Sequence, residues 1–180
     1  IELCIKELHY FEALEVQLEQ ASIADAKEIR EELVKQGYMR PQKTRIRKKK
    51  GQELPHFSTF QFKDIDVYLG KNNLQNEYVT WKLGKKDHIW LHAKDYHGAH
   101  VVIAAAHAEE QLLRDAAMLA AYYSNGRYSS SVPVNYCHIR QLKKIPKTKG
   151  SFVSLTNYHT IYIDPDPSHI QKLLDEHLIR

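Results

Sequence analysis

The hydrophobic pattern of this chain changes its period after the first helical segment, and this change limits the possible folds more than any other feature. Over residues 1–39 the apolar side chains recur at helical spacing, and over residues 57–69 they alternate as in short strands. The helical stripe has heptad-like spacing and consists of Cys4, Leu8, Phe11 and Leu18, with Leu14 beside it. A helical segment therefore precedes a domain that contains a sheet.

The helical segment is expected to consist of two helices. Ser22, with Asp25 three residues later, predicts a cap for a second helix, and Gly37 predicts its end. The stripe of the first helix is short for a stable isolated helix, so it needs a partner face. That partner is either a coiled-coil strand or the domain that follows.

The remaining pattern predicts an α+β fold, with an antiparallel or mixed sheet and packed helices, because strands and helices interleave without a regular β-α-β period. The expected strands cover residues 57–62, 65–69, 89–94, 100–105, 134–144 and 159–163. The expected helices cover residues 73–83 and 107–125, and a last helix opens at residues 165–167.

Positive charge is concentrated in one segment. The chain carries a net charge of +4, of which residues 40–50 contribute +7 and the remainder −3. The basic residues of this segment are Arg40, Lys43, Arg45, Arg47, Lys48, Lys49 and Lys50. Residues 40–55 are interpreted either as a solvated linker or as a tether for polyanions such as nucleic acid.

Composition excludes several classes. No apolar run approaches the roughly 20 residues of a membrane helix, and no signal peptide opens the chain. Cys4 and Cys137 are too far apart in the sequence to form a C-x-x-C pair. They are interpreted as two ordinary thiols in a reducing compartment. Five of the eleven histidines lie between His88 and His107, but no known ligand spacing supports a metal site. No nucleophile motif supports an enzyme, and no cofactor is expected.

Two polar blocks stand between the apolar runs. In the first, Gly70-Lys71-Asn72-Asn73 lies where a strand gives way to a helix, a position suited to binding anions such as phosphate. A capped helix start with a surface lysine is the alternative, and in both cases Lys71 and Asn73 are expected outside the core. In the second block, Trp90, His92, Lys94 and His100 surround one turn and could contact RNA if they share a sheet face.

These blocks resemble the C-terminal RNA-binding domain, NFACT-R, of the NFACT family, whose bacterial members are the RqcH proteins, once called fibronectin-binding protein A-like. The matches to the pattern V-G-K-N-N-x-Q-N-D-x-L-T are Gly70, Lys71, Asn72, Asn73, Gln75, Asn76 and Thr80. Those to D-I-W-x-H-A/T-K-D-x-P-G-S-H-V-I-I are Trp90, His92, Lys94, Asp95, Gly98 and His100. Downstream, Arg127 and the run Val132-Pro133-Val134 also match. The chain departs from the pattern at His97, which replaces a proline.

The resemblance implies three parts: the end of a coiled-coil arm (1–39), a basic linker (40–55) and an NFACT-R domain (56–180). It also implies a cytoplasmic ribosome-associated quality control role, in which the large ribosomal subunit and tRNA are partners and stalled chains receive alanine tails. The expected nucleic-acid contacts are Lys71, Asn72, Asn73, Asn76, His92, Lys94, Asp95, His100, Arg127, Arg45, Arg47, Lys48, Lys49 and Lys50. A fibronectin-binding adhesin fragment and a metal-dependent nuclease are the alternatives.

Deletion of residues 40–50 tests the tether. Each cation that neutralises a phosphate releases a counterion, so the deletion should flatten the dependence of the logarithm of RNA affinity on the logarithm of salt concentration. The measurement is a series of binding isotherms at increasing salt. An unchanged slope would show that this segment does not contact RNA.

Overall fold

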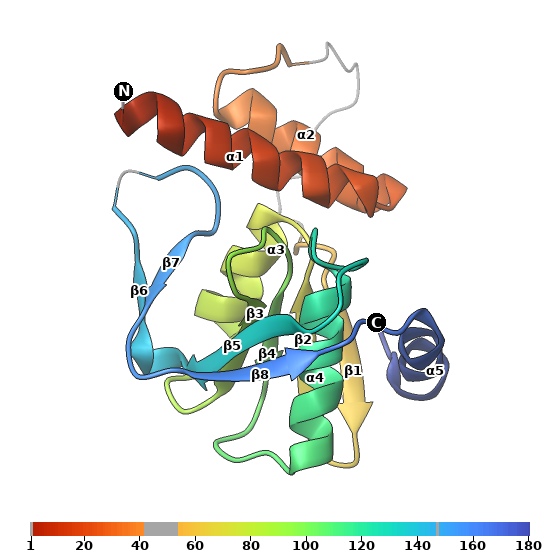
Figure 1. Cartoon of the computed structure of the whole chain (residues 1–180). Helices are drawn as coiled ribbons and strands as arrows, with labels where there is room; N and C mark the ends of the chain where they lie inside the picture. Colours follow the sequence, from red (N-terminus) through yellow and green to blue (C-terminus); the bar gives the residue numbers. More distant parts are fainter. Residues whose placement is uncertain (1, 42–53, 147) are drawn as a thin grey trace.

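The computed structural model describes residues 2–41, 54–146 and 148–180. Helices and strands alternate along it without a βαβ repeat (Figure 1). The helices are α1 (Glu2–Glu19), α2 (Ile23–Lys35), α3 (Asn73–Tyr78), α4 (Glu110–Tyr122) and α5 (Pro167–His177), and a π-helical turn, Val79–Leu83, continues α3. The strands are β1 (Ser58–Phe62), β2 (Ile65–Gly70), β3 (Ile89–Ala93), β4 (His100–Ile103), β5 (Val132–His138), β6 (Leu142–Lys144), β7 (Val153–Leu155) and β8 (His159–Ile163).

Six strands form one sheet in the order β1-β2-β4-β3-β5-β8, and every neighbouring pair is antiparallel. The β6–β7 hairpin stands apart as a second, two-stranded sheet. The predicted α+β class is confirmed, with an antiparallel sheet. The turn between β1 and β2 lies at Lys63, whose φ is +53°, as the alternation of the sequence indicates.

Helices cover both faces of the sheet. On one face α4 and α5 pack over Leu91, Val101 and their neighbours. On the other, α3 and its π-helical turn pack over Trp90 and Val102. Because successive strand residues point to opposite faces, Trp90 and His92 of β3 share the α3 side of the sheet.

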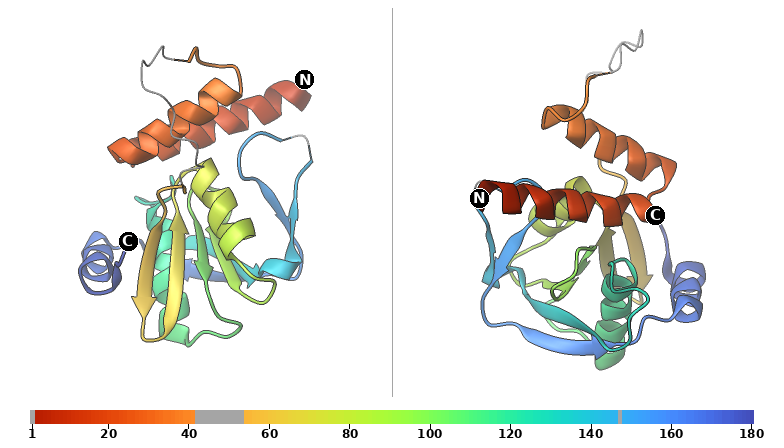
Figure 2. Two further views of the ribbon diagram at one scale, coloured as in Figure 1. Left: turned by 180° about the vertical axis from the view of Figure 1, so that it is seen from behind. Right: turned by 45° about the horizontal axis from the view of Figure 1, so that its top comes forward.

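The helices α1 and α2 form a hairpin that lies across one end of the domain (Figures 1 and 2). Its small core consists of Tyr10, Leu14 and Ile29. Ser22 and Asp25 form a reciprocal capping box at the start of α2, which confirms the predicted cap. At its other end Gly37 has a φ of +83° and the Tyr38 N–H reaches the Leu33 carbonyl, so the predicted stop is also confirmed.

The heptad stripe of α1 is not the face that packs within this chain. Cys4 is exposed, as are Leu8 (57%), Phe11 (41%) and Leu18 (50%). A heptad assumes one partner helix, but α1 contacts α2 on one side and the domain on another, through Ala13 and Gln17. The coiled-coil arm stays a prediction.

Several element boundaries also differ from those expected. The 134–144 strand is divided by a 3₁₀ turn at Ile139–Gln141 into β5 and β6, and α4 begins at Glu110 instead of residue 107. β7 was not predicted, since it is only three residues long.

The hairpin is held by a network of amides and carboxylates. From the first polar block, Gln75 Nε2 donates to Asp25 Oδ1 at 2.6 Å and to Glu28 Oε2 at 2.7 Å. Asn72 Nδ2 donates to the same Glu28 oxygen at 2.8 Å, and Lys71 Nζ lies 3.1 Å from Asp25 Oδ2. We call these five residues the docking network. It satisfies a buried carboxylate, since Asp25 is only 1% exposed.

The electrostatics of the docking network follow from this geometry. Burial alone would raise the pKa of Asp25, but hydrogen bonds from Gln75 and Ser22, with the charge of Lys71, outweigh it and hold the pKa below its usual value. Glu32 shows the opposite balance: burial raises its pKa, although Tyr10 and Asn73 donate hydrogen bonds to it.

Asn73 and Asn76 extend the contact to other elements. The Asn73 N–H donates to Gln17 Oε1 on α1, and Gln17 Nε2 returns a hydrogen bond to Asn73 Oδ1 at 3.0 Å. Asn76 Nδ2 donates to the Gly98 carbonyl and Asn76 Oδ1 accepts from the His100 N–H. Gly70 is required here, because a Cβ would lie 2.7 Å from Asn76 N.

The expectation that Asn73 lies outside the core is therefore wrong: it is 6% exposed, and the Lys71 side chain only 18%. The reason is that the polar block at the start of α3 binds carboxylates of α2 within the same chain, and this contact buries the block. The sequence correctly indicated an anion-binding position but not its occupant.

Gln75→Ala should lower the free energy of unfolding by about 1–3 kcal/mol, because it removes one donor from each of two carboxylates, of which Asp25 is buried. The matched control is Gln111→Ala, which also removes a Gln-to-Asp hydrogen bond (3.0 Å to Asp115) but at an exposed position on α4. It should change stability by no more than about 0.5 kcal/mol. Chemical denaturation measures both, and equal effects would contradict a central role for the docking network.

Candidate nucleic-acid interface

A half-open cleft of about 600 Å³ lies between α1, the connection from β3 to β4, β5 and β7. Its walls combine aromatic rings with a few polar groups. The rings belong to Trp90, Tyr96, Phe152, Tyr158, His9, His92, His97 and His100, and the charged side chains to Lys94 and Asp95. Such a mixture suits a ligand with flat rings and hydrogen-bonding edges.

Trp90, His92 and His100 form one ring cluster at the floor of the cleft. The Trp90 and His92 rings are stacked, with centroids 5.7 Å apart and an angle of 14°. The His100 ring stands edge-on to both, at 5.0 Å from Trp90 and 5.3 Å from His92. Leu91 pairs with Val101, so the register places His92 and His100 on one face, which answers the question that the sequence left open.

His100 is 4% exposed and one of its ring nitrogens has a partner within the fold. Its Nδ1 lies 2.9 Å from Thr80 Oγ1, and burial, with the charge of His92, keeps the pKa well below its usual value. These features favour a scaffold role, and contact with RNA through His100 stays a prediction.

His92 is only partly buried and its ring has no hydrogen bond to any of the described residues. Burial, followed by the charge of His97, lowers its pKa to about 4. The ring is therefore neutral at pH 7 and offers one donor and one acceptor to a ligand.

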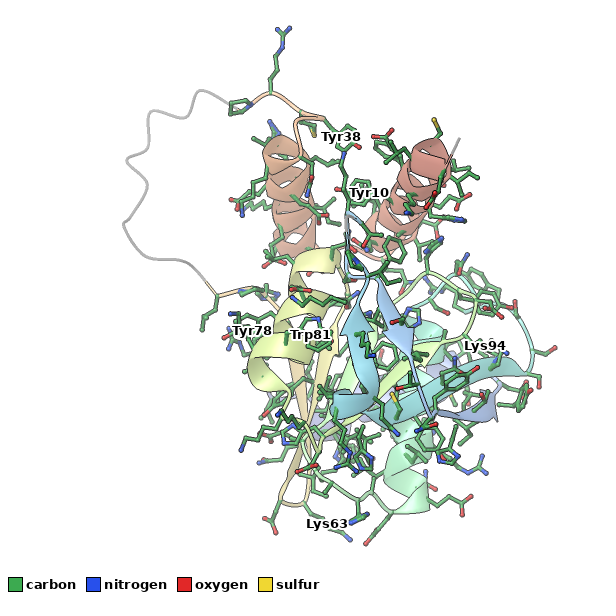
Figure 3. The ribbon with its side chains drawn as sticks, turned by 90° about the vertical axis from the view of Figure 1, so that its left-hand side faces the viewer. Tyr10, Tyr38, Lys63, Tyr78, Trp81 and Lys94 are labelled. Carbon is green, nitrogen blue, oxygen red and sulfur yellow. The ribbon has the colours of Figure 1, made fainter. Side chains whose placement is uncertain are left out.

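Lys94 and Asp95 lie at the rim, in the connection between β3 and β4. Asp95 is exposed with a φ of +60°, and the Lys94 N–H donates to the Pro133 carbonyl at 2.7 Å. Figure 3 shows Lys94 beside the sheet and Lys63 at the end of the domain opposite the α1–α2 hairpin. The connection is fixed against the end of α4, since the Ala99 N–H donates to the Tyr123 carbonyl and a Cβ on Gly98 would lie 2.6 Å from Ser124 Cβ.

Arg127 lies apart from the cleft, in the connection that follows α4. Its guanidinium is 4.8 Å from the Tyr122 ring centroid and 4.9 Å from that of Tyr128, which is 88% exposed. Its Nη2 donates to the Tyr122 hydroxyl, while its buried Nε has no partner among the described residues. This pair of rings around a cation can stack on an exposed base.

The predicted contacts thus divide into four groups. Lys71, Asn72 and Asn73 hold the α1–α2 hairpin, and Asn76 in the same block bonds the β3–β4 connection instead. His92, Lys94, Asp95 and His100 meet in the cleft, and Arg127 is separate. Arg45, Arg47, Lys48, Lys49 and Lys50 lie outside the described residues. Sequence reasoning missed Phe152 and Tyr158, because they reach the cleft from the residues on either side of β7, a strand that was not predicted.

Among the described helices, none combines the length and the apolar character that crossing a membrane requires.

Two family models match this chain. Residues 55–155 match the NFACT protein RNA binding domain, and residues 1–53 match the NFACT N-terminal and middle domains. The boundary falls beside the basic segment, between the α1–α2 hairpin and the sheet.

Relatives agree with this assignment. The Rqc2 homolog RqcH of Bacillus subtilis (strain 168) is 42% identical over 174 residues, which are 96% of this chain and 30% of the relative. The protein of the same name from Streptococcus pneumoniae (strain D39) is 39% identical over 91% of this chain and again 30% of its own length. This chain therefore spans less than a third of these curated relatives.

A solved structure gives the same result in three dimensions. The C-terminal part of the fibronectin/fibrinogen-binding protein from Streptococcus suis has a TM-score of 0.86 and 35% identity, covering 96% of this chain and 69% of that one. The polar blocks, the antiparallel sheet and these matches lead to one assignment: the chain belongs to the NFACT family and contains its RNA-binding domain.

Proposed function

We propose that this chain is the RNA- and ribosome-binding module of a ribosome-associated quality control factor. In this proposal it acts in the cytoplasm, binds the large ribosomal subunit with its tRNA, and supports alanine tailing of stalled chains by the whole protein. The family assignment and the RqcH relatives support the RNA-binding part. The ribosome and tailing parts rest on the resemblance of the two polar blocks to NFACT-R.

The observation that carries the proposal is the cleft with Lys94 at its rim and His92 on its floor. A neutral imidazole hydrogen-bonds a base edge, and an ammonium group contacts a phosphate. Tyr158, which is 43% exposed, adds a ring on which a base can stack. The cleft thus offers each contact that a single-stranded RNA segment needs.

We propose binding and not catalysis as its role. The neutral ring cluster can orient a ligand, but a nucleophile paired with a base would be needed for covalent chemistry. Lys94 and Asp95 lie at the rim, outside the ring cluster, where they can contact RNA that enters the cleft.

Fibronectin binding is the second candidate, because the matching solved structure comes from a fibronectin/fibrinogen-binding protein. The two functions separate in one experiment, in which the chain is offered tRNA, large ribosomal subunits and immobilised fibronectin side by side. Binding to fibronectin alone would refute the RNA proposal.

Lys94→Ala should weaken tRNA binding and reduce the slope of log affinity against log salt by about 1, because one phosphate contact is lost. The matched control is Lys63→Ala, since Lys63 carries the same charge and lies 83% exposed at the far end of the domain. That variant should retain the slope. Equal losses in the two variants would mean that the cleft rim has no special part in binding.

His92→Gln tests the neutral ring. The pKa of His92 is about 4 in the folded chain and about 6.5 when unfolded, so the unfolded state binds more protons between these values. Stability should therefore fall as the pH drops from about 6.5 to about 4, and His92 should make no such contribution above this window. His92→Gln should reduce the slope of unfolding free energy against pH by up to one proton.

The measurement is denaturant unfolding at several pH values, with exposed His107→Gln as the control. An unaltered slope in His92→Gln would show that this ring does not titrate as its position requires.

A further inference from the structure

Two imidazoles and a carboxylate meet where α1 passes the β3–β4 connection. His9 and Glu12, three residues apart on α1, lie side by side, with His9 Nδ1 3.0 Å from Glu12 Oε2. His97 comes from the connection, and its Nε2 lies 3.6 Å from the same oxygen. One ligand atom from each residue falls within 4.8 Å of the other two.

These separations are those of ligands around one small cation. Zinc bonds of about 2.0–2.2 Å in a tetrahedral site place neighbouring ligand atoms roughly 3.3–3.5 Å apart. Small side-chain movements would bring all three atoms to that separation. Two histidines and one glutamate, with the fourth position open to water, form a known zinc ligand set, and imidazole nitrogens favour zinc over calcium or magnesium.

We propose that His9, Glu12 and His97 bind a zinc-class divalent metal ion that joins α1 to the β3–β4 connection. His9 and Glu12 belong to one matched part of the chain and His97 to the other, so the metal would fasten the hairpin to the RNA-binding domain at a second point beside the docking network. It would also stiffen one wall of the cleft, since His9 and His97 both line it.

The surroundings of the three residues suit this role. The His97 side chain is 22% exposed and its ring lies 6.1 Å from that of Phe152, so one side of the site is apolar. Burial lowers the pKa of His97, and Glu12 opposes this effect. The neutral imidazole is the form that binds metal. The His9 side chain is 55% exposed and the Glu12 side chain 44%, which leaves the metal a path from solvent.

An ion pair between a protonated histidine and Glu12 is the alternative, and it predicts no affinity for metal. Zinc alone is therefore the probe. The full chain is freed of metal with a chelator and titrated with zinc chloride by calorimetry at pH 7.5. We expect one high-affinity site per chain and a melting temperature that rises with zinc concentration.

His9→Ala, Glu12→Gln and His97→Ala should each weaken zinc binding by at least about tenfold, as losses around metal sites do. The control is His56→Ala, an exposed histidine outside the cluster, which should change the affinity less than about twofold. Circular dichroism confirms that each variant is folded. His97→Pro, which restores the family residue, provides a second test at the same position and should also lose the site.

Cobalt gives an independent readout, because the visible absorption of bound Co²⁺ reports its ligands. The spectrum of a four-coordinate site should appear in the unchanged chain and disappear in His97→Ala. Absence of zinc binding in the unchanged chain would overturn the proposal. So would one-to-one binding that persists at equal affinity in the His97 and Glu12 variants. Neither result depends on RNA binding, so the outcome is separable from the proposed function.

Discussion

The buried carboxylate of Asp25 is the constraint around which this structure is arranged. A charge that is 1% exposed requires donors on every side, and Gln75, Ser22 and Lys71 supply them. Because Gln75 and Lys71 belong to the polar block at the start of α3, they fix the hairpin to this end of the domain, while Ser22 caps α2 within the hairpin itself. Removal of one donor from such a site destabilises the fold by more than the hydrogen bond itself contributes to stability, because the carboxylate charge remains buried.

The position of the hairpin in turn produces the cleft. With α2 fixed on the polar block, α1 brings Ala13 and Gln17 to one wall of the cleft, and Asn73, which bonds both Gln17 and Glu32, also lines the cleft. Asn76 links the same block to the β3–β4 connection, which forms another wall. The residues that the family pattern shares in its first block thus shape the cleft, while His92, Lys94, Asp95 and His100 of the second block line it.

The fold and part of the site could be predicted from the sequence. Alternation and caps placed the main elements correctly, because period and capping chemistry are local. The partner of Lys71 could not be predicted, since a helix start with a nearby cation is equally suited to a phosphate and to Asp25. Tyr158 and His9 were missed for a related reason. Tyr158 lines the same cleft as His92, and His9 lies beside His97, only in the folded chain, and the spacing of these residues in the sequence does not predict their proximity. His92 and His100 differ in burial and in the hydrogen bond of His100 to Thr80, and both features arise only in the folded chain.

The central claim is that RNA lies in the cleft between the hairpin and the sheet. Photochemical cross-linking of the chain to tRNA that carries 4-thiouridine, followed by mass spectrometry of the linked peptides, tests it most directly. The account predicts cross-links at Tyr158, Phe152 and Tyr96, which line the cleft. Cross-links confined to residues on the opposite face of the sheet, such as those of α4 and α5, would contradict it.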